Sequence, residues 1–236
     1  MKKIILYLLG GSLLFLTSCI ETLEEIYLNK DGSGKYSLTL DMSELFANPM
    51  MKAMLDEAAK EGAADAGLNL GQMDTIIYLK EQAGAGEAMS KGVLHMTMSD
   101  SLEQFVVNMS FPFDEVGQIE QFFKELDEQG GSEAGAMAGS ASMFMPAGLF
   151  EFSKKKLLRK KAGEGAQNEL LAGEEGEFLK MFMASGTYKT VYHLPGKVKK
   201  TTIEGAQVSG NTVTVDRKLL DLMEGKATVD GEIRFK

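Results

Sequence analysis

Several residue types that stabilise proteins or carry chemistry are scarce in this 236-residue chain, which has one cysteine, two histidines, four prolines and no tryptophan. A single cysteine excludes an internal disulfide, so stability must come from packing, for which a chain of this length suffices. Neither His95 nor His193 has the sequence partners of a catalytic triad or a zinc site. We therefore expect both to be ordinary strand residues, with no metal site and no cofactor.

Positive charge is also in the minority, with 25 Lys and Arg against 34 Asp and Glu and a net charge of −9. Nucleic-acid-binding proteins usually carry a basic footprint, so we expect no nucleic acid among the partners. An acidic chain is also repelled by anionic lipid surfaces.

Long apolar runs are rare too. The one at Ile4–Leu16 is shorter than the ~20 residues that span a bilayer, and no second run could do so.

The beginning of the chain has the features of an export signal. Lys2 and Lys3 precede the apolar run, and small residues follow it in Leu16-Thr17-Ser18-Cys19. This last motif resembles the lipobox of bacterial lipoproteins. The resemblance implies that residues 1–18 are a signal peptide that is cleaved off. It also implies that Cys19 carries diacylglycerol on its sulfur and a fatty acid such as palmitate on its amino group.

A lipidated Cys19 would be the membrane anchor of the mature protein, because stable attachment needs more than one acyl chain. We expect residues 19–25 to form the lipidated cysteine and a short tether. The expected location is the bacterial cell envelope, in the outer membrane if the cell has one, with the body periplasmic or surface-exposed.

The remainder, residues 26–236, is predicted to form a single α+β domain. Residues 35–42 alternate between apolar and polar and pair with 23–28 around Asp31-Gly32, a good hairpin signal. We predict further strands at 75–80, 93–98, 105–111 (ended by Pro112), 149–153, 156–161, 187–194, 198–203, 208–215 and 228–235. We predict helices at 49–58, 114–126, 177–184 and 216–223. Short connections between neighbouring strands favour a largely antiparallel sheet with helices packed on one face.

Two segments carry a further resemblance. Leu194-Pro195-Gly196-Lys197-Val198, followed by the hairpin at Val208–Val213, resembles the end of the LppM-type lipoprotein domain, and Leu28–Gly34 is similar to its beginning. The resemblance implies an α/β sandwich at the cell envelope. The matched residues are turn residues, so no ligand-binding position is implied.

Residues 130–148 are dominated by Gly, Ala, Ser and Met. We expect a mobile loop here, or else a boundary between two halves of the chain. Within it, Met143, Phe144 and Met145 are the expected exposed apolar contact for a partner or an amphiphile.

Six basic residues lie within eight positions: Lys154, Lys155, Lys156, Arg159, Lys160 and Lys161. They are candidates for contact with anionic headgroups or glycans. The alternative, which we favour, is a solvated hairpin whose edge is protected by lysines against pairing with other strands.

No motif for catalysis accompanies these features. The sequence therefore predicts a lipid-anchored, non-enzymatic envelope protein that binds a partner protein or an amphiphile, on its sheet face or through residues 130–148. The alternative is an envelope hydrolase acting on glycan or cell-wall polymer through a pair of carboxylates brought together in space. An apolar groove would support the first reading, and two facing buried carboxylates the second.

Overall fold

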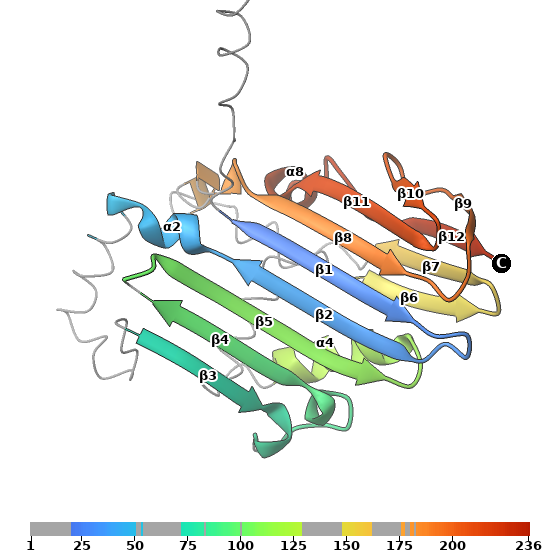
Figure 1. Ribbon diagram of the computed structural model, residues 1–236, viewed down its shortest axis with the longest axis horizontal. Helices are drawn as coiled ribbons and strands as arrows, with labels where there is room; N and C mark the ends of the chain where they lie inside the picture. Colours follow the sequence, from blue (N-terminus) through green and yellow to red (C-terminus); the bar gives the residue numbers. More distant parts are fainter. Residues whose placement is uncertain are drawn as a thin grey trace, which may run out of the picture.

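Strands dominate the part of the chain that the structure, a computed structural model, describes. That part comprises residues 20–50, 53, 72–99, 101–128, 148–161 and 176–236, without residues 83, 178, 179 and 182 and without the Lys161 side chain. Its strands form two sheets, one of eight strands in the order β10-β11-β8-β1-β2-β5-β4-β3 and one of four in the order β6-β7-β12-β9 (Figure 1).

The strands of the larger sheet are β1 (Glu21–Leu28), β2 (Gly34–Asp41), β3 (Gln72–Tyr78), β4 (Val93–Ser99), β5 (Gln104–Phe113), β8 (Thr187–His193), β10 (Gln207–Ser209) and β11 (Thr212–Lys218). Those of the smaller sheet are β6 (Gly148–Ser153), β7 (Lys156–Lys161), β9 (Val198–Thr201) and β12 (Gly231–Phe235). The α-helices are α2 (Ser43–Ala47), α4 (Gly117–Glu128) and α8 (Leu219–Met223), and the short 3₁₀ turns are η2 (Leu79–Glu81) and η3 (Met89–Lys91).

Strand β1 lies near the middle of the larger sheet. It pairs antiparallel with β2 through a turn at which Gly32 has φ +95°, a conformation that glycine adopts without strain. On its other side β1 pairs in parallel with β8, which joins the beginning of the described chain to its last third. The other pairings in both sheets are antiparallel.

The core lies between the two sheets. Alternate residues of the larger sheet point inward, and those of β5 meet helix α4, where Phe111 stacks on Phe122 at 3.8 Å between ring centroids. Leu157 of β7 and Ile233 of β12 enter the same apolar cluster from the smaller sheet. Figure 1 shows the smaller sheet and α4 on the same side of the larger sheet.

The predicted α+β class is therefore wrong: the chain is mostly β, and the part described has only three α-helices, all short. Several strands that we placed in one sheet form the second sheet, which occupies the side expected for helices. The helix predicted at 216–223 begins only at Leu219, because β11 extends to Lys218. The helix predicted at 114–126 is present as α4, whereas most of 49–58 lies outside the described residues. Of 177–184, residues 177, 180, 181 and 183 are described and are helical.

Two local predictions also need correction. Residues 21–25 are the first half of β1, not a tether. Pro112 does not end its strand, because β5 continues to Phe113 and Pro112 pairs with Lys35 of β2. The pairing of β4 with β5 stops at Ser110, so on that side no strand requires a donor from residue 112.

Candidate functional site

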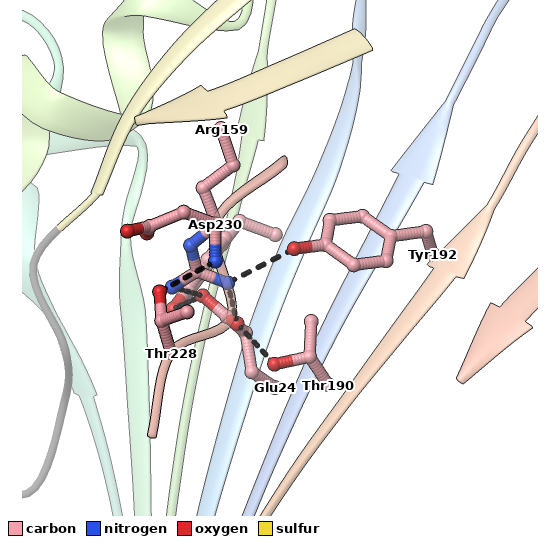
Figure 2. Close-up of polar contacts among 7 residues, drawn as sticks. Glu24, Arg159, Thr190, Tyr192, Thr228 and Asp230 are labelled. Carbon is pink, nitrogen blue, oxygen red and sulfur yellow. Dashed lines mark hydrogen bonds and ion pairs between the residues drawn. The ribbon is translucent and has the colours of Figure 1, made fainter. Parts of the chain in front are cut away.

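A buried ionic cluster joins the two sheets. On β1 the side chains of Thr22, Glu24 and Ile26 all point inward, so the alternation of the strand places a carboxylate among apolar residues. On β7 the same alternation sends Arg159 inward from the opposite sheet. Glu24 is 1% exposed and Arg159 2% exposed, and Figure 2 shows the two side chains meeting between the sheets.

The two charges are closely matched. Arg159 donates from Nη1 to Glu24 Oε2 at 2.5 Å and from Nη2 to Oε1 at 3.2 Å. Glu24 also accepts from the hydroxyls of Tyr36 at 2.9 Å and Thr190 at 2.8 Å. Arg159 Nη1 donates to the Tyr192 hydroxyl at 3.1 Å and its guanidinium lies 5.0 Å from the centre of the Phe150 ring. Side chains from five strands of the two sheets, β1, β2 and β8 in one and β6 and β7 in the other, thus meet at one carboxylate–guanidinium pair.

The pair changes the acid–base properties of its neighbours. Burial disfavours the charge of Arg159, but the Glu24 carboxylate more than compensates and holds the Arg159 pKa well above its ordinary value. Burial, reinforced by Glu24, raises the pKa values of Tyr36 and Tyr188 well above 10.0. Burial also raises the pKa of Tyr192 to about 12, although Arg159 opposes the shift. The cluster therefore keeps its tyrosines protonated and Arg159 charged.

The Glu24–Arg159 pair links the two sheets, and we call it the clamp. Glu24 is the only buried acid among the described residues, and the same residues contain no group of three or more His, Cys, Asp or Glu that could hold a metal ion. No buried carboxylate faces Glu24 in this part of the chain. Sequence reasoning missed the clamp entirely, although a Glu within the apolar alternation Ile20, Thr22, Glu24, Ile26 and Leu28 is a signal that could have revealed its first half.

The opposite face of the larger sheet carries both histidines. His193 on β8 stacks on Tyr27 of β1 at 4.1 Å between ring centroids, and its Nε2 lies 3.2 Å from Glu25 Oε1. The Nε2 atom of His95 on β4 lies 2.6 Å from Oδ1 of Asp74 on β3. Both are strand residues, as the sequence predicted, but each also has a carboxylate partner.

Large apolar side chains are exposed on the same face. Tyr27 is 41% exposed, and Ile76 and Tyr78 on β3 are 54% and 47% exposed. Tyr27 is held by its stack on His193 and by a hydrogen bond from its hydroxyl to Glu25. We call this side of the sheet the aromatic face; it carries Tyr27 and His193 near the middle of the sheet and Ile76 and Tyr78 on its edge strand.

The predicted basic residues separate into two groups. Lys154 and Lys155 form the exposed turn between β6 and β7, and Lys156 and Lys160 point outward from β7. Arg159 points inward, so its predicted contact with an anionic surface is wrong. Lys160 pairs with Glu151 on the neighbouring strand. Of Lys161, only the backbone at the end of β7 is described.

Strand pairing brings in basic residues that the sequence analysis did not consider. Lys156 lies directly opposite Arg234 of β12, and Arg234 lies opposite Lys200 of β9. Lys156 and Arg234 point away from the core, because their strand neighbours Leu157, Ile233 and Phe235 are buried. Lys200 is opposite Arg234 and is exposed. No local sequence signal could have joined residues 156, 200 and 234, since only the register of the strands does so.

Other predicted site residues lie outside the described part of the chain. They are Cys19 and the apolar group Met143, Phe144 and Met145. Of the segment 130–148, only Gly148 is described, and it begins β6. No described helix is long and apolar enough to cross a membrane.

No family model matches the chain, and no curated protein matches it. Among solved structures it is similar to the NMR structure of the folded domain of the Mycobacterium tuberculosis LppM protein. The two share 10% sequence identity with a TM-score of 0.46, over 95% of each chain.

Proposed function

We propose that this is a non-enzymatic cell-envelope protein, anchored through lipid on Cys19, that binds a partner protein or an amphiphile on its aromatic face. The observation that carries the proposal is that, within the described residues, one face of the larger sheet points away from the core and carries the exposed side chains of Tyr27, Ile76 and Tyr78. Aromatic residues are enriched where partners bind, because they bury much area at little entropic cost.

The beginning of β1 supports the anchoring half of the proposal. Ile20 is 1% exposed, and its carbonyl accepts a hydrogen bond from Thr187 N at 2.8 Å. One peptide bond therefore separates Cys19 from the folded body. Lipid on Cys19 would hold this end of the larger sheet close to the bilayer, with no room for a flexible tether.

The preorganisation of the aromatic face supports the binding half. Tyr27 is fixed by the ring of His193 and by Glu25, so it loses little freedom when a partner covers it. Carboxylates and imidazoles beside exposed rings provide the polar rim that interfaces usually have around apolar contacts.

Anchoring is tested by metabolic labelling with an alkynyl fatty acid. We expect the wild-type chain to incorporate the label and to sediment with membranes, and Cys19→Ala to do neither. Ser18→Ala keeps a small residue before the cut and serves as the control, which should behave as wild type. Equal labelling of wild type and Cys19→Ala would refute the anchor.

Binding is tested by placing a photo-crosslinking amino acid at Tyr27 or Ile76 in cells. The control position is Lys124, which is exposed on α4 on the other side of the larger sheet. We expect a discrete crosslinked species, identifiable by mass spectrometry, from positions 27 and 76 and not from 124. The same products from all three positions, or none from 27 and 76, would overturn the proposed face.

A further inference from the structure

The smaller sheet carries a row of like charges on its outer face. Lys156, Arg234 and Lys200 occupy directly opposed positions on the adjacent strands β7, β12 and β9, and we call them the cationic row. Neighbouring strands lie ~4.8 Å apart, so the row extends about 10 Å across the sheet. Lys156 is 39% exposed and Arg234 62% exposed, which leaves their charged groups available to a ligand.

This arrangement is unfavourable for the fold itself. Like charges directly opposite one another on neighbouring strands destabilise a sheet. Glu232 relieves part of the repulsion, since it bonds Arg234 and lies 3.5 Å from Lys156 Nζ. Within the described residues, no acid lies within ion-pair distance of Lys200. Protecting a sheet edge does not explain the row either, because Arg234 lies on an inner strand.

More cations surround the row. The turn residues Lys154 and Lys155 adjoin it, because Phe235 N donates to Lys155 O at 3.0 Å. Lys154 has φ +51°, a conformation that is costly for a lysine and ordinary for glycine or asparagine. From the other side, Lys197 and Lys199 flank Lys200 and are both exposed. Together with the row, these four lysines form what we call the basic surface, on a chain whose net charge is −9.

The basic surface lies far from Ile20, the first residue that the structure describes. Strand β1 runs for eight residues from the end next to Cys19 to the turn at Gly32, a length of about 26 Å at ~3.3 Å per residue. That turn contacts β6, because a methyl group on Gly32 would lie 2.7 Å from the Phe152 ring. Figure 1 shows the β6–β7 turn and β9 at the end of the molecule toward which β1 points.

From these observations we infer that the basic surface binds a linear polyanionic glycan, whose negative groups recur along its length. A row of charges fits a chain of charges, and flexible lysine stems adapt to spacings that a deep pocket would not tolerate. The placement of the surface opposite the anchor disfavours lipid headgroups of the anchoring membrane. The inference rests on the proposed envelope location for access to such a polymer, whereas the binding itself does not require the anchor.

The test uses the full-length protein purified from membranes and reconstituted into neutral phosphatidylcholine vesicles. Polygalacturonate, a linear polymer of acidic sugars, is the probe, and uncharged dextran is the neutral reference. We expect polygalacturonate to bind with an affinity that falls steeply as salt rises, and dextran not to bind. The variant Lys156→Gln/Lys200→Gln/Arg234→Gln should bind about a hundredfold more weakly, since one cation near an anionic surface contributes a factor of roughly five.

A matched control separates local from overall charge. Lys124→Gln/Lys189→Gln/Lys218→Gln removes the same charge from exposed positions outside the basic surface and should bind as wild type. The row variant should have a urea midpoint close to that of wild type, because the loss of the two exposed pairs with Glu232 is offset by the relief of repulsion. Equal weakening by both variants, or tighter docking to phosphatidylglycerol vesicles than to the polymer, would overturn the inference. If the protein fails to remain with the vesicles but still binds the polymer in solution, the anchor is refuted and this inference stands.

Discussion

Removing one partner of the Glu24–Arg159 pair should destabilise the protein far more than removing both. In Arg159→Met, the Glu24 carboxylate stays buried and keeps the hydroxyls of Tyr36 and Thr190, but it loses both guanidinium bonds and the opposite charge. Breaking a buried pair from one side costs about 3–5 kcal/mol. We expect a loss of that size from the free energy of unfolding in Arg159→Met.

Glu24→Leu should cost a similar amount, because the Arg159 guanidinium then stays buried without its carboxylate. The double variant Glu24→Leu/Arg159→Met leaves no buried charge, and well-packed apolar replacements of buried pairs are often neutral or stabilising. Its stability should therefore lie near that of wild type. The cycle then gives a coupling free energy equal to the sum of the two single losses, about 6–10 kcal/mol.

The assay is urea unfolding of the mature protein in mild detergent, followed by far-UV circular dichroism. The exposed pair Lys160–Glu151, on the two strands β6 and β7, provides the control: Lys160→Met should change stability by less than about 1 kcal/mol. Two outcomes would refute a stabilising role for the buried pair. One is that both single variants are as stable as this control, and the other is that the double variant loses as much stability as the two single variants together.

Two other predictions follow from the core. The unfolded-state tyrosine pKa is about 10 and that of folded Tyr192 about 12, so the native state retains a proton that the unfolded state loses. Stability should thus be unaffected by this group below pH 10 and fall by about 2.7 kcal/mol between pH 10 and 12. Tyr192→Phe should reduce that fall in alkaline denaturation, and an unchanged profile would contradict the assignment. Gly34→Ala should destabilise the protein strongly, because its Cβ would lie 2.0 Å from the Tyr27 carbonyl oxygen, whereas Gly117→Ala has open space in α4 and should stabilise it by roughly 0.5–1 kcal/mol. Thermal melting of both variants checks this, and equal effects would be inconsistent with the packing described.

Local pattern was sufficient to predict most strands. The β1–β2 hairpin, β4, β7 and β8 lie within a few residues of their predicted positions, because alternation and turn residues act over short distances. The partition into two sheets could not be predicted in this way. Strand β12 alternates between apolar and polar residues as β11 does, and only the packing of its inward side chains decides which sheet it joins.

The same distinction between local and long-range information applies to the candidate site. The lysines of the β6–β7 hairpin were evident as a cluster, but the inward direction of Arg159 depends on strand register and on a partner 135 positions away. The contacts of Arg234 with Lys156 and Lys200 are likewise long-range pairings. The cluster of basic residues in the sequence therefore correctly indicated that β7 contributes to the basic surface. It also led us to place Arg159 on that surface, although Arg159 is buried and pairs with Glu24.

The most direct measurement of the account is the position of the two ends of the molecule relative to the membrane. A fluorophore is attached in the lipidated, reconstituted protein at Ser185→Cys, close to Ile20, or at Ser153→Cys, beside the basic surface; both serines are exposed. Lipids with quenching headgroups then report proximity. We predict strong quenching at position 185 and little at position 153, because residue 153 lies on β6 near the far end of β1, a strand about 26 Å long. Equal quenching at both positions, or stronger quenching at 153, would contradict it.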